Sequence, residues 1–182
     1  KKIVEILQAG GIILYPTDTV WGIGCDPTNE QAVQKIYDLK RRADSKAMLL
    51  LTDSMAKVQA YVTDVPDVVW DLVECAEKPL TVIYPQGRNL ATNLMAQDGS
   101  VGIRITNEAF SKQLCMRFKK PIVSTSANVS GQPTPAFFDE ISEEIKAGVD
   151  YIVQARQDDR EKKQPSSIIK FEKNGTFVLL RP

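Results

Sequence analysis

The sequence predicts an α/β domain built on a twisted, mixed, open sheet with helices packed against it. Segments with strand and helix patterns alternate along the chain, which is typical of this class. The chain closes with two strand patterns around Asn174–Gly175, a strong hairpin signal that argues against an all-parallel sheet. A single domain over residues 1–182 is expected, because this length suits one core and no repeat or long linker divides it.

Apolar spacing and stop signals place the individual elements. Helices are expected over residues 2–9, 28–40, 53–61, 66–76, 107–118 and 138–147. Strands are expected over residues 12–15, 48–51, 80–84, 101–105, 122–124, 149–153, 167–171 and 176–180. Thr28 and Gln31 have the spacing of a capping box, and Asn107 is the expected cap of the helix that ends at Phe118. The charged stretch 154–164 is expected to be a loop.

Charge and composition exclude several classes of protein. The 23 basic residues balance the 23 acidic ones, which argues against bulk electrostatic binding of nucleic acid but not against a local basic pocket. The sequence has no histidine, so it lacks the usual general base and the commonest zinc ligand, and no protein-built metal site is predicted. Its three cysteines lie far apart, as expected of a reduced, cytoplasmic protein. No apolar run reaches the roughly 20 residues that span a bilayer.

Four segments place polar or charged residues beside predicted strands. They are residues 15–24, residues 40–46, Arg104 in its apolar strand, and residues 122–131. Ligands of open α/β sheets usually bind at strand ends, and Arg and Lys suit phosphate. Turn formation and solvation at a helix end explain the three loop segments equally well. A buried Arg104 requires an anionic partner, which could come from the protein or from a ligand.

No Walker loop, dinucleotide fingerprint, nucleophile elbow or zinc-protease motif is present. The residues by themselves therefore predict an anion pocket, for phosphate and carboxylate, without naming a reaction.

In this order, the segments resemble the threonylcarbamoyl-AMP synthase (YrdC-like) family. The matching stretches are YPTDTVWGIGCD (15–26), IYDLKRR (36–42), PLTV (79–82), VGIRI (101–105), PIVSTSANVSG (121–131) and LRP (180–182). Each stretch is a weak signal, but their combination over nearly the whole chain is specific. The resemblance implies an open α/β fold around a deep, positively charged cavity, in the short form of the family with one domain.

The resemblance also implies an activity. The family condenses L-threonine, bicarbonate or CO2, and ATP into threonylcarbamoyl-AMP and pyrophosphate, which makes it a nucleotidyltransferase, and Mg2+ is expected to assist. A partner complex then transfers the threonylcarbamoyl group to N6 of adenosine 37 in tRNA. The implied partners are thus these substrates, the transfer complex and tRNA, with no membrane, in the cytoplasm.

The resemblance assigns site residues by position. Lys40 and Arg42 would be the catalytic cations, and no side-chain nucleophile is needed. Nucleotide contacts would come from Arg42, Lys46, Ser100, Ser126, Asn128, Thr134 and Arg181. L-threonine would contact Thr19, Arg104, Ser124 and Ser166, and Arg104 would bind its carboxylate.

The sequence departs from the family pattern in several places. Ala43 and Leu51 stand where the family often has Pro and His, Thr106 replaces a usual Pro, and residues 154–164 replace a Gly-rich stretch. Three alternatives remain open: a YciO-like paralogue, a carbamoyl-adenylate domain as in hydrogenase-maturation proteins, and a non-catalytic module that binds double-stranded RNA or tRNA. The pairs Lys40/Arg42 and Ser126/Asn128 favour the synthase over the YciO-like branch.

Overall fold

The computed structural model describes residues 1–41 and 48–182, so Arg42, Ala43 and Lys46 lie outside the described residues. The predicted mixed α/β fold is confirmed, because nine strands of the described ranges form one sheet in the order β7-β1-β2-β6-β3-β5-β4-β8-β9. The strands are β1 (Ile13–Tyr15), β2 (Gly22–Gly24), β3 (Leu49–Thr52), β4 (Leu80–Tyr84), β5 (Val101–Ile105), β6 (Ile122–Ser126), β7 (Tyr151–Ile152), β8 (Ser167–Phe171) and β9 (Phe177–Arg181). The helices are α1 (Lys2–Gln8), α2 (Glu30–Lys40), α3 (Met55–Val58), α4 (Asp67–Cys75), α5 (Ala109–Phe118) and α6 (Glu143–Gly148), with a 3-10 turn, η1 (Phe138–Glu140).

The sheet is mixed along its whole width. Strands β1/β7, β3/β5 and β4/β8 pair in parallel, whereas β1/β2, β2/β6, β3/β6, β4/β5 and β8/β9 are antiparallel. Strand β6 joins the two halves, because Ile122–Ser124 pair with β3 and Thr125 and Ser126 pair with β2. The hydroxyl-rich end of β6 therefore lies where three strands meet.

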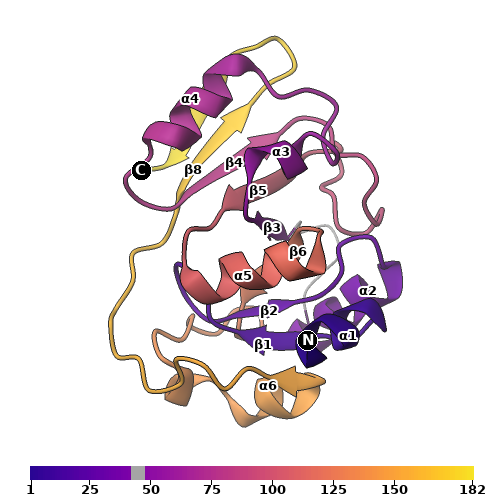
Figure 1. Cartoon of the computed structure of the whole chain (residues 1–182), viewed down its shortest axis with the longest axis vertical. Helices are drawn as coiled ribbons and strands as arrows, with labels where there is room; N and C mark the ends of the chain where they lie inside the picture. The colour runs from indigo at the N-terminus through magenta and orange to yellow at the C-terminus, as the bar shows by residue number, and fades with distance from the viewer. Residues whose placement is uncertain (42–47) are drawn as a thin grey trace.

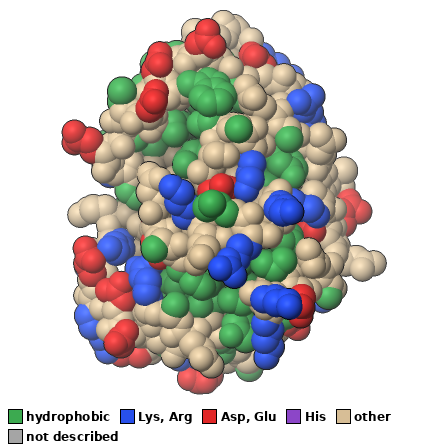
Figure 2. All heavy atoms as spheres, in the orientation of Figure 1, with side chains coloured by type: hydrophobic (Ala, Val, Ile, Leu, Met, Phe, Trp, Pro, Cys, Tyr) green, Lys and Arg blue, Asp and Glu red, His purple; other side chains and the backbone are tan. Residues whose placement is uncertain are grey.

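Helices cover the sheet unevenly (Figure 1). Helix α5 crosses in front of the middle strands, α4 lies beside β8 near the C-terminus, and α6 lies beside β1 at the opposite end. On this face, Lys and Arg side chains gather around the middle, where α5 lies, and many acidic side chains lie nearer the rim (Figure 2). Although the total charge is neutral, this face has a local excess of positive side chains at its middle and of negative side chains nearer its rim. Within the described residues, none of the helices combines the length and the apolar character that a membrane crossing requires.

Strand β2 is absent from the sequence-based prediction. Its three residues, Gly22–Gly24, are all buried, but two of them have no side chain that could produce an apolar pattern. A Cβ at Gly24 would lie 2.6 Å from both Tyr15 Cε1 and Val123 O. Glycine is needed here because β2 is confined between the ring of Tyr15 and the backbone of β6.

Two predicted helix caps are wrong by one residue. Asn29, not Thr28, caps α2, and its Oδ1 accepts from Ala32 N at 3.0 Å. Glu108, not Asn107, caps α5, because its two carboxylate oxygens accept from Phe110 N at 2.9 Å and Ser111 N at 2.8 Å. A carboxylate can satisfy two free backbone N–H groups at once and also favours the positive end of the helix dipole.

Two predicted helices are shorter than expected. The helix predicted over residues 53–61 is reduced to the single turn of α3, and the helix predicted over 138–147 is split into η1 and α6. Ile141 and Ser142, which separate the two, have extended backbones, and Ser142 Oγ caps α6 by accepting from Ile145 N at 3.4 Å. The strands predicted over residues 80–84 and 101–105 are confirmed with the bounds of β4 and β5.

Candidate functional site

A cavity of about 470 Å³ is lined by residues of four consecutive strands of the sheet, β2, β6, β3 and β5. This volume is in the range of small-molecule sites. The cavity collects predicted ligand contacts from segments that are far apart in the sequence: Thr19, Arg104, Ser124, Ser126, Thr134, Ser166 and Arg181. Lys162 and Lys163 also line it, and among the described residues no Asp or Glu does.

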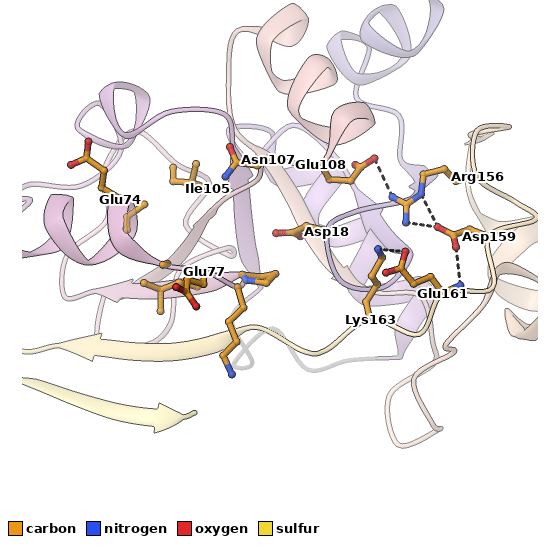
Figure 3. Close-up of a pocket in the computed structure, with 15 residues that line it drawn as sticks. Asp18, Glu74, Glu77, Ile105, Asn107, Glu108, Arg156, Asp159, Glu161 and Lys163 are labelled. Atoms are coloured by element: carbon orange, nitrogen blue, oxygen red, sulfur yellow. Dashed lines mark hydrogen bonds and ion pairs between the residues drawn. The ribbon is translucent and has the colours of Figure 1, made fainter.

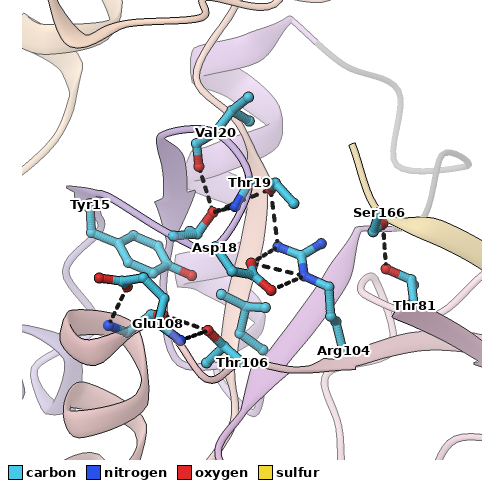
Figure 4. Close-up of polar contacts among 12 residues, drawn as sticks. Tyr15, Asp18, Thr19, Val20, Thr81, Arg104, Thr106, Glu108 and Ser166 are labelled. Atoms are coloured by element: carbon cyan, nitrogen blue, oxygen red, sulfur yellow. Dashed lines mark hydrogen bonds and ion pairs between the residues drawn. The ribbon is translucent and has the colours of Figure 1, made fainter. Parts of the chain in front are cut away.

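Arg104 is the most buried cation of the cavity, and Asp18 is its partner (Figure 4). The residue is only 3% exposed. Its Nε donates to Asp18 Oδ1 and Oδ2 at 3.0 and 3.1 Å, and its Nη2 donates to Oδ1 at 2.8 Å. The anionic partner that the sequence requires for Arg104 therefore comes from the protein itself.

The loop after β1 is built to hold Asp18 and Thr19 in place. Thr17 Oγ1 donates to Val20 O at 2.6 Å and accepts from Thr19 N at 3.1 Å, which closes a tight turn around Asp18. Thr19 Oγ1 accepts from Arg104 Nη2 at 3.3 Å. The hydroxyl of Thr19 and the carboxylate of Asp18 therefore both contact Arg104 from the same loop.

Lys40 lies beneath the cavity rather than in its lining. At the last position of α2 it is 2% exposed, and its Nζ donates to Thr125 Oγ1 at 2.9 Å and Ser126 Oγ at 3.2 Å. Ser126 Oγ in turn donates to Asn128 Oδ1. The structure therefore brings Lys40, Ser126 and Asn128 into one hydrogen-bonded chain below the ligand space.

The far wall of the cavity comes from the ends of the β8/β9 hairpin. Ser166 Oγ lies 2.8 Å from Thr81 Oγ1, and Arg181 Nε donates to Ser166 O at 2.7 Å. Arg181 Nη2 donates to Ser166 Oγ at 3.3 Å. The guanidinium of Arg181 and the hydroxyl of Ser166 are thereby fixed at the same edge.

Two of the predicted nucleotide contacts within the described residues, Ser100 and Asn128, are not in this lining. Arg42 and Lys46 lie outside the described residues. Ser100 precedes β5, whereas Arg104 lies near its other end, so about 13 Å of extended strand separates them. Ser100 is 5% exposed and its N donates to Asp98 Oδ1, and its contact with a nucleotide stays a prediction.

Comparison with known proteins decides the family. The Sua5/YciO/YrdC family model, described as "Telomere recombination", matches residues 5–182. The chain belongs to the Sua5/YciO/YrdC family. It is 36% identical over 153 residues to a threonylcarbamoyl-AMP synthase of Pseudoalteromonas translucida, covering 82% of each chain. It is 31% identical over 171 residues to a threonylcarbamoyl-AMP synthase of Vibrio parahaemolyticus, covering 92% of this chain and 91% of the relative.

Solved structures of the Sua5/YciO/YrdC family share the fold. Sua5 of P. abyssi, complexed with L-threonine, superposes with a TM-score of 0.86 at 22% identity, covering 100% of this chain and 53% of that one. YciO of E. coli superposes with a TM-score of 0.83 at 23% identity, covering 99% of this chain and 86% of that one.

Leu51, at the Sua5/YciO/YrdC position where a histidine was expected, belongs to the core. It is fully buried and pairs with Arg104 across β3 and β5. Its carbonyl oxygen lies 3.5 Å from Cys115 Sγ, and its side chain is not in the cavity lining. The substitution therefore leaves an apolar core position and no polar contact to the cavity.

The buried thiols are unsuited to nucleophilic chemistry at neutral pH. Burial raises the pKa of the Cys115 thiol to about 12 and also raises the pKa of Cys25. The thiolate is the reactive form of cysteine, so both groups stay protonated and inert. Within the described residues there is no cluster of three or more His, Cys, Asp or Glu side chains that could hold a metal ion.

A second, larger cavity of about 680 Å³ adjoins the first and has the opposite character (Figure 3). Carboxylates outnumber cations in its lining: Asp18, Glu74, Glu77, Glu108, Asp159 and Glu161 against Lys78, Arg156 and Lys163. Lys163 lines both cavities, while Arg104 lines only the smaller and Asp18 only the larger. The Arg104–Asp18 pair is thus part of the wall between a basic and an acidic space.

Arg156 is a site-forming residue that the sequence did not reveal. Its Nη1 donates to Thr17 O at 3.0 Å and lies 3.0 Å from Glu108 Oε2, and its Nη2 lies 2.9 Å from Asp159 Oδ2 (Figure 3). It therefore ties the predicted loop 154–164, the loop after β1 and the start of α5 together. In the sequence it is one charge among many in a polar stretch, and only the fold gives it three partners.

Proposed function

We propose that this chain is an L-threonylcarbamoyladenylate synthase, a nucleotidyltransferase that uses ATP, L-threonine and bicarbonate or CO2. The observation that carries the proposal is the smaller cavity, in which four cations and several hydroxyls converge without a carboxylate in the described lining. Such a lining suits a ligand with a triphosphate and a carboxylate. Relatives that are 31–36% identical over most of the chain are named threonylcarbamoyl-AMP synthase, which supports the proposal. The similarity to YciO, at 23% identity, concerns the fold alone.

The threonine side of the cavity is assigned to Thr19, Arg104, Ser124 and Ser166. Arg104 binds the amino-acid carboxylate, because it is the buried cation nearest the loop after β1 and has one nitrogen left for a ligand. The complex of P. abyssi Sua5 with L-threonine supports an amino-acid subsite in this fold.

The nucleotide side is assigned to Arg42, Lys46, Ser100, Ser126, Asn128, Thr134 and Arg181. Arg181 and Ser126 line the same cavity as Arg104 and would contact the phosphates. Lys40 acts from below by fixing Ser126. The triphosphate is expected to carry Mg2+, which supplies charge neutralisation when bound.

The reaction needs no enzyme nucleophile. The α-amine of L-threonine attacks CO2, forms the C–N bond of a carbamate and releases one proton to solvent; with bicarbonate, water leaves instead. A carbamate oxygen then attacks the α-phosphorus of ATP, the bond to the bridging oxygen breaks, and pyrophosphate leaves. Positioning of the reactants and neutralisation of phosphate charge by Arg and Lys are the contributions of the protein.

The product is a reactive acyl adenylate, so a second protein must consume it. We assign that step to a threonylcarbamoyl-transfer complex acting on N6 of adenosine 37 in tRNA. Residues 1–182 would form one YrdC-like domain, a proposal supported by the single sheet and by the family match over residues 5–182.

Pyrophosphate release tests the proposal. The purified protein should release pyrophosphate from ATP only when L-threonine, bicarbonate and Mg2+ are all present. Arg104→Ala should raise the KM for L-threonine by about tenfold to a hundredfold, because it removes a charge-assisted hydrogen bond to the ligand. Arg181→Ala should instead raise the KM for ATP.

Arg160→Ala is the matched control, since Arg160 makes an exposed ion pair with Asp139 outside both cavities. It should leave both KM values unchanged. Pyrophosphate release that ignores L-threonine, or no release together with tight binding of tRNA, would refute the synthase activity.

A further inference from the structure

Asp18 controls the orientation of the Arg104 guanidinium. Its carboxylate lies along one edge of the guanidinium, within 3.0 Å of Nε and 2.8 Å of Nη2 through Oδ1. The two side chains are 11% and 4% exposed, so neither has room or solvent in which to turn freely. A planar guanidinium held by a carboxylate along one edge has a fixed plane and a fixed direction.

The same contacts leave one nitrogen of Arg104 for a ligand. No hydrogen bond joins Nη1 to any residue of the described ranges 1–41 and 48–182, and Nη1 points away from Asp18 (Figure 4). Arg104 lines the smaller cavity, whereas Asp18 lines the larger one. Asp18 therefore approaches the guanidinium from the side opposite the ligand space, and an incoming carboxylate can bind Nη1 without displacing it.

We infer that Asp18 is a positioning residue that aims Arg104 Nη1 at the carboxylate of the amino-acid substrate. The inference rests on the proposed synthase function and adds a residue to the recognition of L-threonine. Asp18 acts only through Arg104, so its contribution is confined to ligands that carry a carboxylate.

The flexibility of the Arg104 side chain explains why a second group, the carboxylate of Asp18, is needed to orient its guanidinium. Arg has a long side chain with several rotatable bonds, and an unheld guanidinium loses conformational entropy when it binds a ligand. Thr19 Oγ1, at 3.3 Å from Nη2, is its other side-chain partner within the described ranges and is uncharged. Without Asp18, the guanidinium would have to be oriented by the ligand, at the expense of affinity.

The test compares L-threonine with L-threoninol, in which a hydroxymethyl group replaces the carboxylate. Calorimetry should show that the wild-type protein prefers L-threonine. Asp18→Asn keeps the size of the side chain but replaces the carboxylate with an amide, and it should reduce this preference by about tenfold through weaker binding of L-threonine alone. In the synthase assay the KM for L-threonine should rise while the KM for ATP stays unchanged.

Asp26→Asn is the matched control, because Asp26 is equally buried and pairs with Lys120 but lines neither cavity. It should keep the preference for L-threonine. Asp18→Asn leaves the positive charge of the buried Arg104 without its carboxylate partner, so the double variant Asp18→Asn/Arg104→Met is used to remove both charges. If Asp18 acts only through Arg104, the double variant should discriminate between L-threonine and L-threoninol no better than Arg104→Met alone.

Two results would overturn the inference while the synthase function stands. Asp18→Asn could keep the full preference, or it could bind L-threonine more tightly, which would make Asp18 a competitor of the substrate carboxylate. Failure of the wild-type protein to bind L-threonine or to release pyrophosphate would instead overturn the proposed function, and with it this role of Asp18.

Discussion

Lys40 Nζ, at the end of α2, donates to both Oγ and the carbonyl oxygen of Ser126 on β6. Lys40, which the family resemblance assigns as a catalytic cation, is thus 2% exposed and held among protein oxygens. The amide N of Ser130 also donates to Lys40 O at 2.9 Å, which fixes the helix end to the loop after β6. This geometry favours an indirect role, in which Lys40 sets the position of the hydroxyl that faces the cavity.

Replacement of Lys40 should therefore damage both stability and catalysis. Lys40→Met removes the charged donor and leaves buried oxygens of Thr125 and Ser126 without it, so the free energy of unfolding should fall by about 2–4 kcal/mol. Urea denaturation measures this change, and the synthase assay should show a lower kcat/KM for ATP.

Lys35 on the same helix provides the control. It is exposed and its Nζ makes one hydrogen bond, at 3.2 Å, to Gly10 O. Lys35→Met should change the free energy of unfolding by only about 0.5 kcal/mol. Equal losses in the two variants would contradict a special role for the buried lysine.

Arg156 should be needed for the shape of the cavity rather than for contact with substrate. It joins Thr17, Glu108 and Asp159, and it precedes Lys162 and Lys163 of the cavity lining. Arg156→Ala should lower kcat/KM by about tenfold or more, because small displacements of positioning groups are costly to catalysis. Hydrogen exchange over residues 156–163 should become faster in the variant.

Arg160→Ala serves again as the comparison, because its ion pair with Asp139 is 63% and 55% exposed. Exposed pairs contribute little, about 0–1 kcal/mol, so this variant should exchange like the wild type. Unchanged exchange and activity in Arg156→Ala would refute the positioning role.

The centre of the fold could be predicted from the sequence because its strands are short apolar runs between turn residues. β4 and β5 have the predicted bounds for this reason. β2 could not be predicted, since Gly-Ile-Gly carries one side chain and becomes a strand only through pairing with β1 and β6. Asn29 and Glu108 were missed as caps because several neighbouring residues have suitable side chains, and only the backbone geometry selects one.

The candidate site was predictable in part for a similar reason. A lone Arg104 in an apolar strand indicated a buried cation that needs an anion. That the anion is Asp18, 86 residues earlier in the chain, follows only from the pairing of β6 with both halves of the sheet. Arg156 carried no local pattern at all, so its three contacts could be found only in the structure.

The cysteines should differ sharply in reactivity. Cys75 is exposed, whereas Cys25 and Cys115 are buried and burial raises the pKa of each thiol, that of Cys115 to about 12. Iodoacetamide at neutral pH should therefore modify Cys75 alone, as read by mass spectrometry of the folded protein. Cys75→Ser should be fully active and resist modification. If the folded Cys75→Ser variant lost activity when treated with iodoacetamide, a reaction without a cysteine nucleophile would be contradicted.

Asp26 should give the protein a measurable loss of stability in acid. Burial alone would raise the pKa of its carboxyl, but hydrogen bonds from Thr28 and Lys120 outweigh burial and lower the pKa below the ordinary value of 3.8. Since the folded-state pKa is the lower one, ionised Asp26 stabilises the folded protein above pH 3.8, and this contribution is lost as the pH falls through the folded-state pKa.

Asp26→Asn isolates this effect. At pH 6 the variant should be less stable than the wild type by about 1–3 kcal/mol, because a buried, charge-assisted set of hydrogen bonds is weakened. The difference should shrink as the pH falls below 3.8, the ordinary value for the carboxyl, which urea denaturation across the acid range would measure. Asp38→Asn, at an exposed position of α2, should change the stability only slightly at pH 6. If the difference in the free energy of unfolding between the wild type and Asp26→Asn were equally large in acid, the charge of the carboxylate would not stabilise the fold.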